Sequence, residues 1–336
     1  MDPLHFFLVN VWLCFIGLFL VLYVVLDGFD LGIGVLSLFA GREERREIMM
    51  ASLGSVWDAN ESWLVVLGGA LFGAFPLAYA IILNALYLPL VTMLFALIFR
   101  AVAFEFRVHA RNKRGWGLAF GLGSLMAAVC QGFTLGGLIG GVAVENGQFA
   151  GGALEWLTPF SAFAALGVVF GYVLLGATYL ILKTEGPHQA RARKQAWLAF
   201  ALMLAAAAIV SIWTPLRFPV IAQRWFAAET FYLFAVPPLF ALLCSAMLAR
   251  ALIRRQESAP LLWSIGIFLA SALGLAASFY PYIVPRAVTA FDAAADNLTL
   301  AFMMVGIGLL VPTMLVYNAY QYLVFRGKVS GSYGEG

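Results

Sequence analysis

Acidic side chains interrupt apolar stretches at two places in this sequence. Asp58 and Glu61 stand three positions apart at the start of the run "VWDANESWLVVLGGALFGAF". Asp27 and Asp30 have the same spacing in "VVLDGFDLGIGVL", so each pair shares one face of a helix. A carboxylate at the centre of a bilayer costs roughly 2.5 to 3.5 kcal/mol even on insertion-based scales. Such acids indicate either ion pairing between helices or the transfer of protons or ions.

A third stretch, "LIFRAVAFEFRVHARNKR", places Arg100, Glu105 and Arg107 near the end of another apolar run. In one interpretation, Arg100 and Arg107 pair with Glu105 and Asp30 and hold neighbouring helices in register. In the other, buried carboxyl groups hold and pass protons. We favour proton transfer because the acids come from three consecutive segments; of these acids, Glu105 is the one best explained as a salt-bridge partner.

The composition places these acids in a membrane protein. Of 336 residues, 63% are hydrophobic and only 11% are charged, whereas soluble domains carry about 25% charged residues. Apolar stretches long enough to cross a bilayer predict a single all-α polytopic domain, residues 1–336, with nine transmembrane helices. The expected spans are residues 7–39, 49–75, 78–106, 116–142, 157–182, 195–215, 229–250, 260–282 and 297–325.

The basic residues predict the direction of these spans. All but three of the 20 Lys and Arg residues follow spans one, three, five, seven or nine, and the exceptions are Arg217, Arg224 and Arg286. By the positive-inside rule, the N-terminus lies outside and the C-terminus lies in the cytoplasm. The basic residues are scattered over several loops and a tail, which argues against a nucleic-acid partner.

The direction of each span predicts how deep in the membrane its acidic residues lie. If the second span starts near Met49, Asp58 lies about 14 Å inside the membrane from the cytoplasmic side, at 1.5 Å per residue. Asp27 lies about 30 Å along the first span on the same rule, in the inner half of a tilted helix. The three groups of acids are therefore expected on the cytoplasmic side.

Potential metal and haem ligands are sparse. His5, His109 and His188 are the only histidines, and none lies deep in an expected span. Paired histidine ligation of a haem is therefore not expected, and no residue of this chain is assigned to a metal, a cofactor or a catalytic step. Three cysteines stand inside apolar runs without metal-ligand spacing, which favours packing roles.

The same stretches carry a resemblance to a known family. "LDGFDLGIGVL", "VWDANESWL", "GGALFGAFPLAYA" and "FRAVAFEFR", in this order over the first third of the chain, resemble subunit II of the cytochrome bd-type quinol oxidases. "GATYL" is a weaker match further on. The modest length and short outer loops are similar to the cyanide-insensitive branch.

The resemblance implies an arrangement and a function. Two four-helix bundles (residues 7–142 and 157–282) and a ninth helix (297–325) would support a subunit I that binds haem b and haem d in a heterodimer. The complex would oxidise quinol and reduce dioxygen to water in the bacterial inner membrane, taking protons from the cytoplasm without pumping. Phospholipid, a small single-helix accessory subunit and, in some members, a structural quinone would also bind.

The resemblance also implies roles for particular residues. Asp58 matches an acid on the proton path, with Asp30, Glu105 and Asp27 as accessory acids. The residues expected at the subunit interface or on an oxygen route are Trp57, Trp63 and Asn60, although packing explains the tryptophans equally well. Glu61 replaces a residue that is often neutral, and we expect it to be a bystander. The alternatives are a proton-coupled secondary transporter, for which no internal repeat is found, and a purely structural partner subunit.

Overall fold

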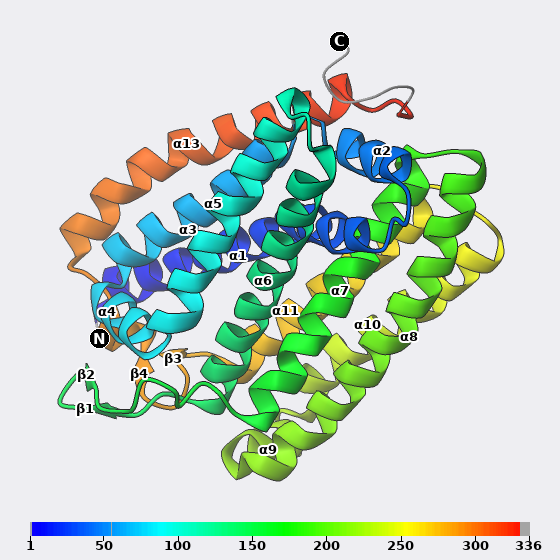
Figure 1. Ribbon diagram of the computed structural model, residues 1–336. Helices are drawn as coiled ribbons and strands as arrows, with labels where there is room; N and C mark the ends of the chain where they lie inside the picture. The colour runs from blue at the N-terminus through cyan, green and yellow to red at the C-terminus, as the bar shows by residue number, and fades with distance from the viewer. Residues whose placement is uncertain (1, 55, 330–336) are drawn as a thin grey trace.

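The computed structural model describes residues 2–54 and 56–329 as a helical membrane protein with two short β-hairpins (Figure 1). The first half contains α1 (Pro3–Leu38), α2 (Glu43–Leu53), α3 (Trp57–Ala74), α4 (Pro76–Ala85), α5 (Tyr87–His109), α6 (Lys113–Gly140), β1 (Val144–Glu145) and β2 (Gln148–Phe149). The second half contains α7 (Pro159–Lys183), α8 (Gly186–Arg217), α9 (Pro219–Phe226), α10 (Phe231–Ile253), α11 (Ala259–Phe279), β3 (Tyr282–Val284), β4 (Val288–Thr289), α12 (Ala290–Ala293) and α13 (Asn297–Val324).

Within the described residues, eight helices are long and apolar enough to cross a membrane: α1, α5, α6, α7, α8, α10, α11 and α13. The expectation of an all-α membrane protein is therefore confirmed. The second expected span is represented by α3, which has 18 residues and is not among the eight. Its first two turns carry Asp58, Asn60 and Glu61, which lower its apolar character.

Two expected spans are interrupted by breaks, and a third begins earlier than predicted, because α8 starts at Gly186 and the expected span at residue 195. Residues 49–53 belong to α2, and Gly54, with a φ of 52°, separates this helix from α3. Residues 78–106 are divided between α4 and α5 at Leu86. Pro76 is the first residue of α4, and Pro89 lies in the first turn of α5. Proline is tolerated there because the first N–H groups of a helix have no intrahelical partner.

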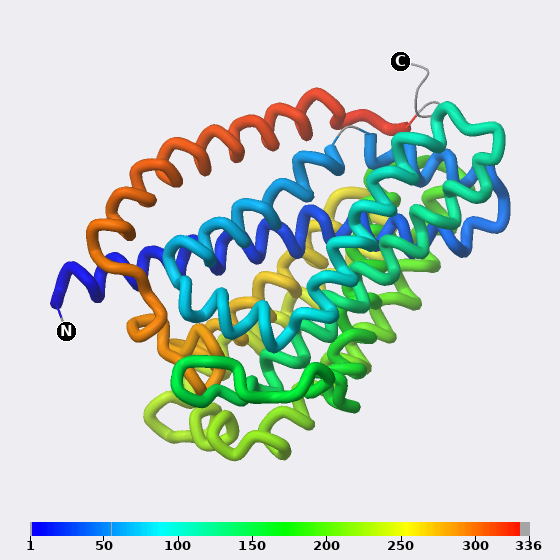
Figure 2. Tube along the Cα trace, turned by 60° about the vertical axis from the view of Figure 1, so that its left-hand side comes forward, coloured from blue at the N-terminus to red at the C-terminus, as the bar shows by residue number. Residues whose placement is uncertain are grey.

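The connections gather at two ends of the helical bundle. Both hairpins, α9 and the N-terminus lie towards one end, whereas α2, the α7–α8 connection and the end of α13 lie towards the other (Figures 1 and 2). The residues of α1 that carry Asp27 and Asp30 are near its C-terminal end, which leads into α2. The acidic residues of the first three expected spans therefore belong to the α2 end of the bundle.

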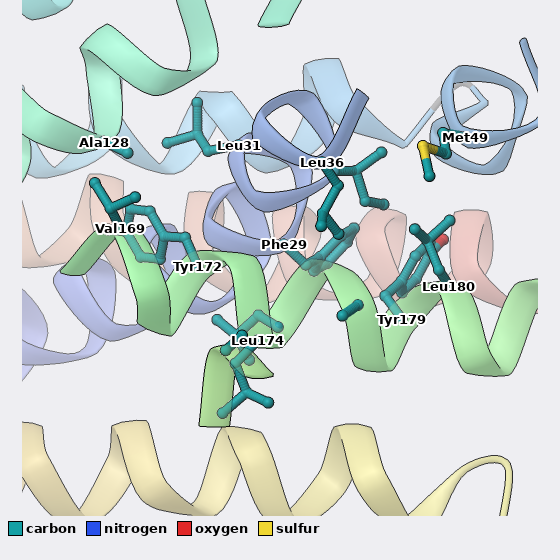
Figure 3. Close-up of a cluster of buried hydrophobic side chains, with 14 of the residues drawn as sticks. Phe29, Leu31, Leu36, Met49, Ala128, Val169, Tyr172, Leu174, Tyr179 and Leu180 are labelled. Carbon is teal, nitrogen blue, oxygen red and sulfur yellow. The ribbon is translucent and has the colours of Figure 1, made fainter. Parts of the chain in front are cut away.

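The core joins α1 directly to α7. A Cβ atom on Gly32 would lie 1.8 Å from the carbonyl oxygen of Tyr172, and one on Gly176 would lie 2.6 Å from the backbone nitrogen of Ile33. Glycine at both positions lets the two backbones meet. Next to this crossing, the rings of Phe29 and Tyr179 stack with centroids 4.3 Å apart (Figure 3).

Helix α13 runs along one side of the bundle (Figure 2) and packs on α1 and α3. Its other side chains form a largely exposed apolar face, which includes Phe302, Val305, Leu309 and Val316. Helix α5 also exposes large apolar side chains, among them Phe95, Ile98, Phe99 and Phe106. Such surfaces contact lipid or another membrane subunit.

Candidate functional site: a buried acid cluster around Arg100

Arg100 of α5 lies at the centre of a group of buried acids. Its Nη1 atom is 2.8 Å from Oδ1 of Asp27 and 3.8 Å from Oε1 of Glu61, and its Nη2 atom is 3.9 Å from Oδ2 of Asp30. The side chains of Arg100, Asp27 and Asp30 are at most 2% exposed, whereas that of Glu61 is 21% exposed. One guanidinium group therefore faces three carboxyl groups from α1 and α3.

An amide and a phenol extend this cluster to α13. Nδ2 of Asn60 donates hydrogen bonds to Oδ2 of Asp30 at 2.9 Å and to the Leu26 carbonyl at 3.4 Å. The hydroxyl of Tyr322 donates to Oδ1 of Asn60 at 2.8 Å. Asp30 is thereby linked through Asn60 to α13, although Tyr322 lies far from α3 in the sequence.

Small residues allow the charged groups to be buried so closely. Every residue of α1 from Asp27 to Ser37 is buried, including Gly28, Gly32 and Gly34. On α6, a Cβ atom at Gly123 would lie 2.8 Å from the Ala96 carbonyl and 3.2 Å from Cβ of Arg100. Glycine at this position therefore lets α5, with its arginine, pack closely against α6.

Several polar atoms of the cluster keep unused hydrogen-bonding capacity. Among the described residues, Asp27 Oδ2, Asp30 Oδ1 and the Nε and Nη2 atoms of Arg100 are buried without a hydrogen-bond partner. Buried polar groups without partners are unusual in folded proteins, and they concentrate where a site has a role beyond packing. The cluster is thus a set of partly satisfied charged groups in an apolar surrounding.

Asp58 lies closer to the helix start than the sequence predicted. Because α3 begins at Trp57, Asp58 is in its first turn and is exposed. The expected depth of about 14 Å assumed a continuous helix from Met49 at 1.5 Å per residue, and the break at Gly54 removes that assumption. Glu61 follows one turn later and approaches Arg100, so it lies between exposed Asp58 and the buried acids.

The expected partners of the arginines are partly wrong. Arg107 pairs with Glu43 of α2 at 2.6 Å, and Arg46 also contacts Glu43. Arg100 approaches Asp30, as expected, but bonds more closely to Asp27. Glu105 is exposed on the other side of α5, and no ion pair to it is found in the part of the chain that the structure describes.

Glu43 itself lies on α2, outside the membrane-spanning helices, and its partner Arg107 is in the last turn of α5. Partial burial by itself would raise the pKa of Glu43, but the hydrogen bond from Arg107 and the charge of Arg46 outweigh it. The pKa of Glu43 is therefore lower than its ordinary value. On the same helix, Glu47 accepts a hydrogen bond from Lys113 at 2.9 Å, so α2 is tied to both α5 and α6.

The two tryptophans of α3 have different surroundings. Trp63 is fully buried, and its ring stacks on Phe19 of α1 with centroids 6.1 Å apart. Its Nε1 atom has no hydrogen-bond partner among the described residues. Trp57 is half-buried and packs against Phe104, with ring centroids 5.4 Å apart. Both contacts are those of packing aromatics within the first half of the chain.

The sequence interpretation missed Glu43 and Tyr322, and it expected Glu61, which approaches Arg100, to be a bystander. The signal for Glu61 was present in its spacing from Asp58, which puts both side chains on one helix face. Glu43 is the first residue of α2, and nothing in the sequence distinguishes it from an ordinary surface acid. No local pattern connects Tyr322 to Asn60, because their contact depends on where α13 docks.

Comparison with known proteins identifies the family. The family described as cytochrome bd terminal oxidase subunit II matches residues 8–325. The chain belongs to this family. It is 30% identical to cytochrome bd-I ubiquinol oxidase subunit 2 of Escherichia coli K12, over 95% of this chain and 94% of that protein. It is 28% identical to cytochrome bd ubiquinol oxidase subunit 2 of Bacillus subtilis 168, over 98% of both chains.

A solved structure has the same fold as this subunit II. The bd oxidase structure from Geobacillus thermodenitrificans contains a chain that superposes with a TM-score of 0.72 at 19% identity, covering 94% of this chain and 98% of that one. The expected resemblance is therefore confirmed, and the chain is a subunit of a cytochrome bd quinol oxidase, an oxidoreductase of the membrane. A subunit II implies a complex with a subunit I.

Haem ligation does not fit the residues of this subunit. His5 lies near the end of α1 with Nδ1 2.7 Å from Oδ1 of Asn297, His109 is exposed at the end of α5, and His188 is in the first turn of α8. These histidines belong to different parts of the surface. In the described ranges, no group of three His, Cys, Asp or Glu side chains is placed to hold a metal ion.

Proposed function

We propose that this subunit carries protons from the cytoplasmic surface to a haem-bearing subunit I, with which it forms a heterodimer. Asp58 receives the proton at the surface, Glu61 passes it inward, and the cluster of Asp27, Asp30 and Arg100 holds it in the membrane. The observation that carries this proposal is the pairing of a single guanidinium group with two fully buried acids and one partly exposed acid.

The charge balance of the cluster supports a mobile proton. One arginine neutralises one carboxylate, which leaves a second buried acid without a counter-charge. An isolated buried carboxylate is far more costly than a neutral carboxyl group, so a proton is the simplest way to balance it. The hydrogen-bonding atoms of Asp27 and Asp30 that lack a partner remain able to exchange that proton.

The orientation follows from the ends of the bundle. The basic clusters around Arg42–Arg46, Arg191–Lys194 and Arg326–Lys328 belong to the α2 end, so this end faces the cytoplasm by the positive-inside rule. On this basis α3 is the ninth membrane crossing and the N-terminus is outside. The subunit would lie in the bacterial inner membrane, with four crossings from the first half of the chain, four from α7 to α11 and the last from α13.

The exposed apolar face of α5 and α13 is the surface that we assign to subunit I. Helix α13 packs on α3, which carries Trp57 and Asp58 in its first turn, so a partner on α13 would lie next to the helix that delivers the protons. Haem b and haem d would be held by that partner, where they would supply the reduction of dioxygen by electrons from quinol. Glu105, exposed on α5, would then contact the partner rather than the proton path.

A purely structural role for the acids is the competing proposal. The hydrogen bond of 2.8 Å between Arg100 and Asp27 supports it for that pair, because such a bond fixes α1 against α5. It does not account for Glu61, which stands 3.8 Å from an arginine that is already paired. The two proposals therefore differ most at Glu61 and Asp58.

The test uses the assembled oxidase with Asp58→Asn or Glu61→Gln, and Glu44→Gln, at an exposed acid of α2, as the control. Quinol-driven oxygen consumption and proton uptake by proteoliposomes are measured together with haem content. We expect both path variants to retain haem and lose about tenfold in turnover, because each removes a group that passes a proton. Full turnover and full proton uptake in both variants would contradict a role in proton transfer. The control variant should behave as wild type.

A further inference from the structure

A small cavity opens among α2, α7 and α8 at the cytoplasmic end, away from the Arg100 cluster. Arg45, His188 and Arg191 contribute its polar wall, and Ile48, Met49 and Leu180 contribute its apolar floor. All the residues that line it are described, and none of them is acidic. A cationic rim above an apolar floor is the pattern of a site for an amphipathic anion.

Two backbone carbonyls hold the arginines in place. Nη2 of Arg191 donates to the Phe39 carbonyl at 2.9 Å, and Nη1 of Arg45 donates to the Ala40 carbonyl at 3.4 Å. These carbonyls are consecutive at the end of α1, so the two guanidinium groups lie close together. Each uses one N–H group for this contact, and a guanidinium group has five. The remaining donors are available to a ligand.

No carboxylate neutralises this pair. The structure contains no ion pair to Arg45 or Arg191 within the described residues. On α2, Glu43 is used by Arg46 and Arg107, and Glu47 by Lys113. Two nearby acids, Glu44 and Glu185, are exposed to solvent. The positive charges are therefore gathered without a protein counter-charge, and the N-terminus of α8 adds a partial positive charge of its own.

The cavity lies at the level of the membrane surface. After Gln195, the sequence of α8 becomes apolar, and Trp197 and Leu198 are 39% and 64% exposed. Tryptophan is enriched at the boundary between hydrocarbon and headgroups, and the side chains beyond it contact acyl chains. A ligand in the cavity would thus have its charged part at headgroup level.

We propose that Arg45 and Arg191, at the mouth of this cavity of about 10 Å³, bind the headgroup phosphate of an anionic phospholipid between them. The guanidinium groups bind phosphate oxygens with paired N–H donors, which is the geometry that favours arginine over lysine. Free inorganic phosphate offers the same oxygens. The position at the membrane surface favours the lipid, because its acyl chains can continue along the exposed apolar side chains of α8 at Trp197 and Leu198.

Native mass spectrometry of the delipidated, assembled oxidase tests this site. The variant Arg45→Gln/Arg191→Gln is compared with Arg42→Gln/Lys194→Gln, which removes the same charge from exposed positions next to the cavity. Phosphatidylglycerol, phosphatidylcholine and inorganic phosphate are titrated in turn. We expect the cavity variant to lose roughly tenfold or more in phosphatidylglycerol affinity, because each basic side chain near a membrane surface contributes several-fold.

The control variant should lose less than about threefold in phosphatidylglycerol affinity, and phosphatidylcholine should bind all forms alike. Equal losses in both variants would assign the effect to general surface charge and overturn the site. Saturation by inorganic phosphate, with phosphatidylglycerol independent of the arginines, would overturn the lipid assignment. If the glutamine variant does not assemble, Arg45→Lys/Arg191→Lys keeps the charge, and unchanged phosphatidylglycerol affinity in that variant would contradict the proposal.

Discussion

Two arginines of α5 stand seven positions apart and have different surroundings. Arg100 and Arg107 are both buried, with side chains 2% and 4% exposed. The acids around Arg100 are buried as well and outnumber it, whereas Glu43, the partner of Arg107, is 36% exposed. Water can therefore stabilise one ion pair and not the other. The same residue type on one helix face thus belongs to a buried acid cluster at one level and to a partly hydrated ion pair at the other.

The largest expected effect comes from removing the central cation. Arg100→Gln leaves Asp27 and Asp30 buried without a positive partner, and breaking a buried pair in this way costs about 3 to 5 kcal/mol. We expect a strong loss of assembled complex, measured by haem content and by thermal unfolding in detergent. Arg107→Gln is the matched control and should cost about 1 kcal/mol, since Glu43 stays hydrated.

A second substitution sharpens this prediction. Asp27→Asn in the Arg100→Gln background removes the charge that the arginine had balanced, so it should restore part of the lost stability. The same Asp27→Asn change in the wild-type background should destabilise the complex. If the double variant is no more stable than Arg100→Gln alone, the uncompensated charge is not the cause, and the contrast between the two arginines disappears.

The sequence accounted for the helices better than for their partners. Apolar runs located most spans within a few residues, but they did not reveal the breaks at Gly54 and Leu86, where the backbone turns without a strong polar signal. Helical spacing argues against one expected ion pair, that of Arg100 with Glu105. Glu105 is five positions from Arg100, roughly 140° around a helix, so the two side chains do not share a face. Arg100 and Arg107, which are seven positions apart, do share a helix face.

Other features depend on tertiary packing and could not be read locally. Asp58 and Glu61 stand out in the sequence because they interrupt an apolar stretch, and their spacing places them on one helix face. That Arg100 reaches both α1 and α3 depends on how α5 is rotated against α6 at Gly123. The contact between Asn60 and Tyr322 depends on the docking of α13 after a long intervening chain. The sequence pattern predicts which side chains share a helix face, but it does not predict which helix packs against that face.

A third prediction concerns the link from the buried cluster to α13, for which the Arg107 site has no counterpart. Tyr322→Phe removes the donor to Oδ1 of Asn60 and leaves this buried acceptor without its partner, at a cost of about 1 kcal/mol. We expect a lower melting temperature of the complex. Tyr232→Phe alters an exposed tyrosine of α10, outside the surface assigned to subunit I, and should have no effect. Equal melting temperatures for all three proteins would show that this hydrogen bond does not hold α13.

The smallest expected effect is at the surface pair, and it depends on pH. The pKa of Glu43 is lower in the folded protein than its ordinary value of 4.5, so the folded state favours the ionised carboxylate. Its contribution to stability is present above pH 4.5 and is lost as the pH falls through the lower folded-state pKa. Because Glu43 is partly hydrated, the contribution is about 0.5 kcal/mol.

Glu43→Gln should therefore reduce the melting temperature slightly at neutral pH and not at a pH below both pKa values. Glu44→Gln, an exposed neighbour, should change neither measurement. A Glu43→Gln effect of several kcal/mol at neutral pH would mean that water does not reach this pair, and the two arginines would then differ only in how many acids surround them.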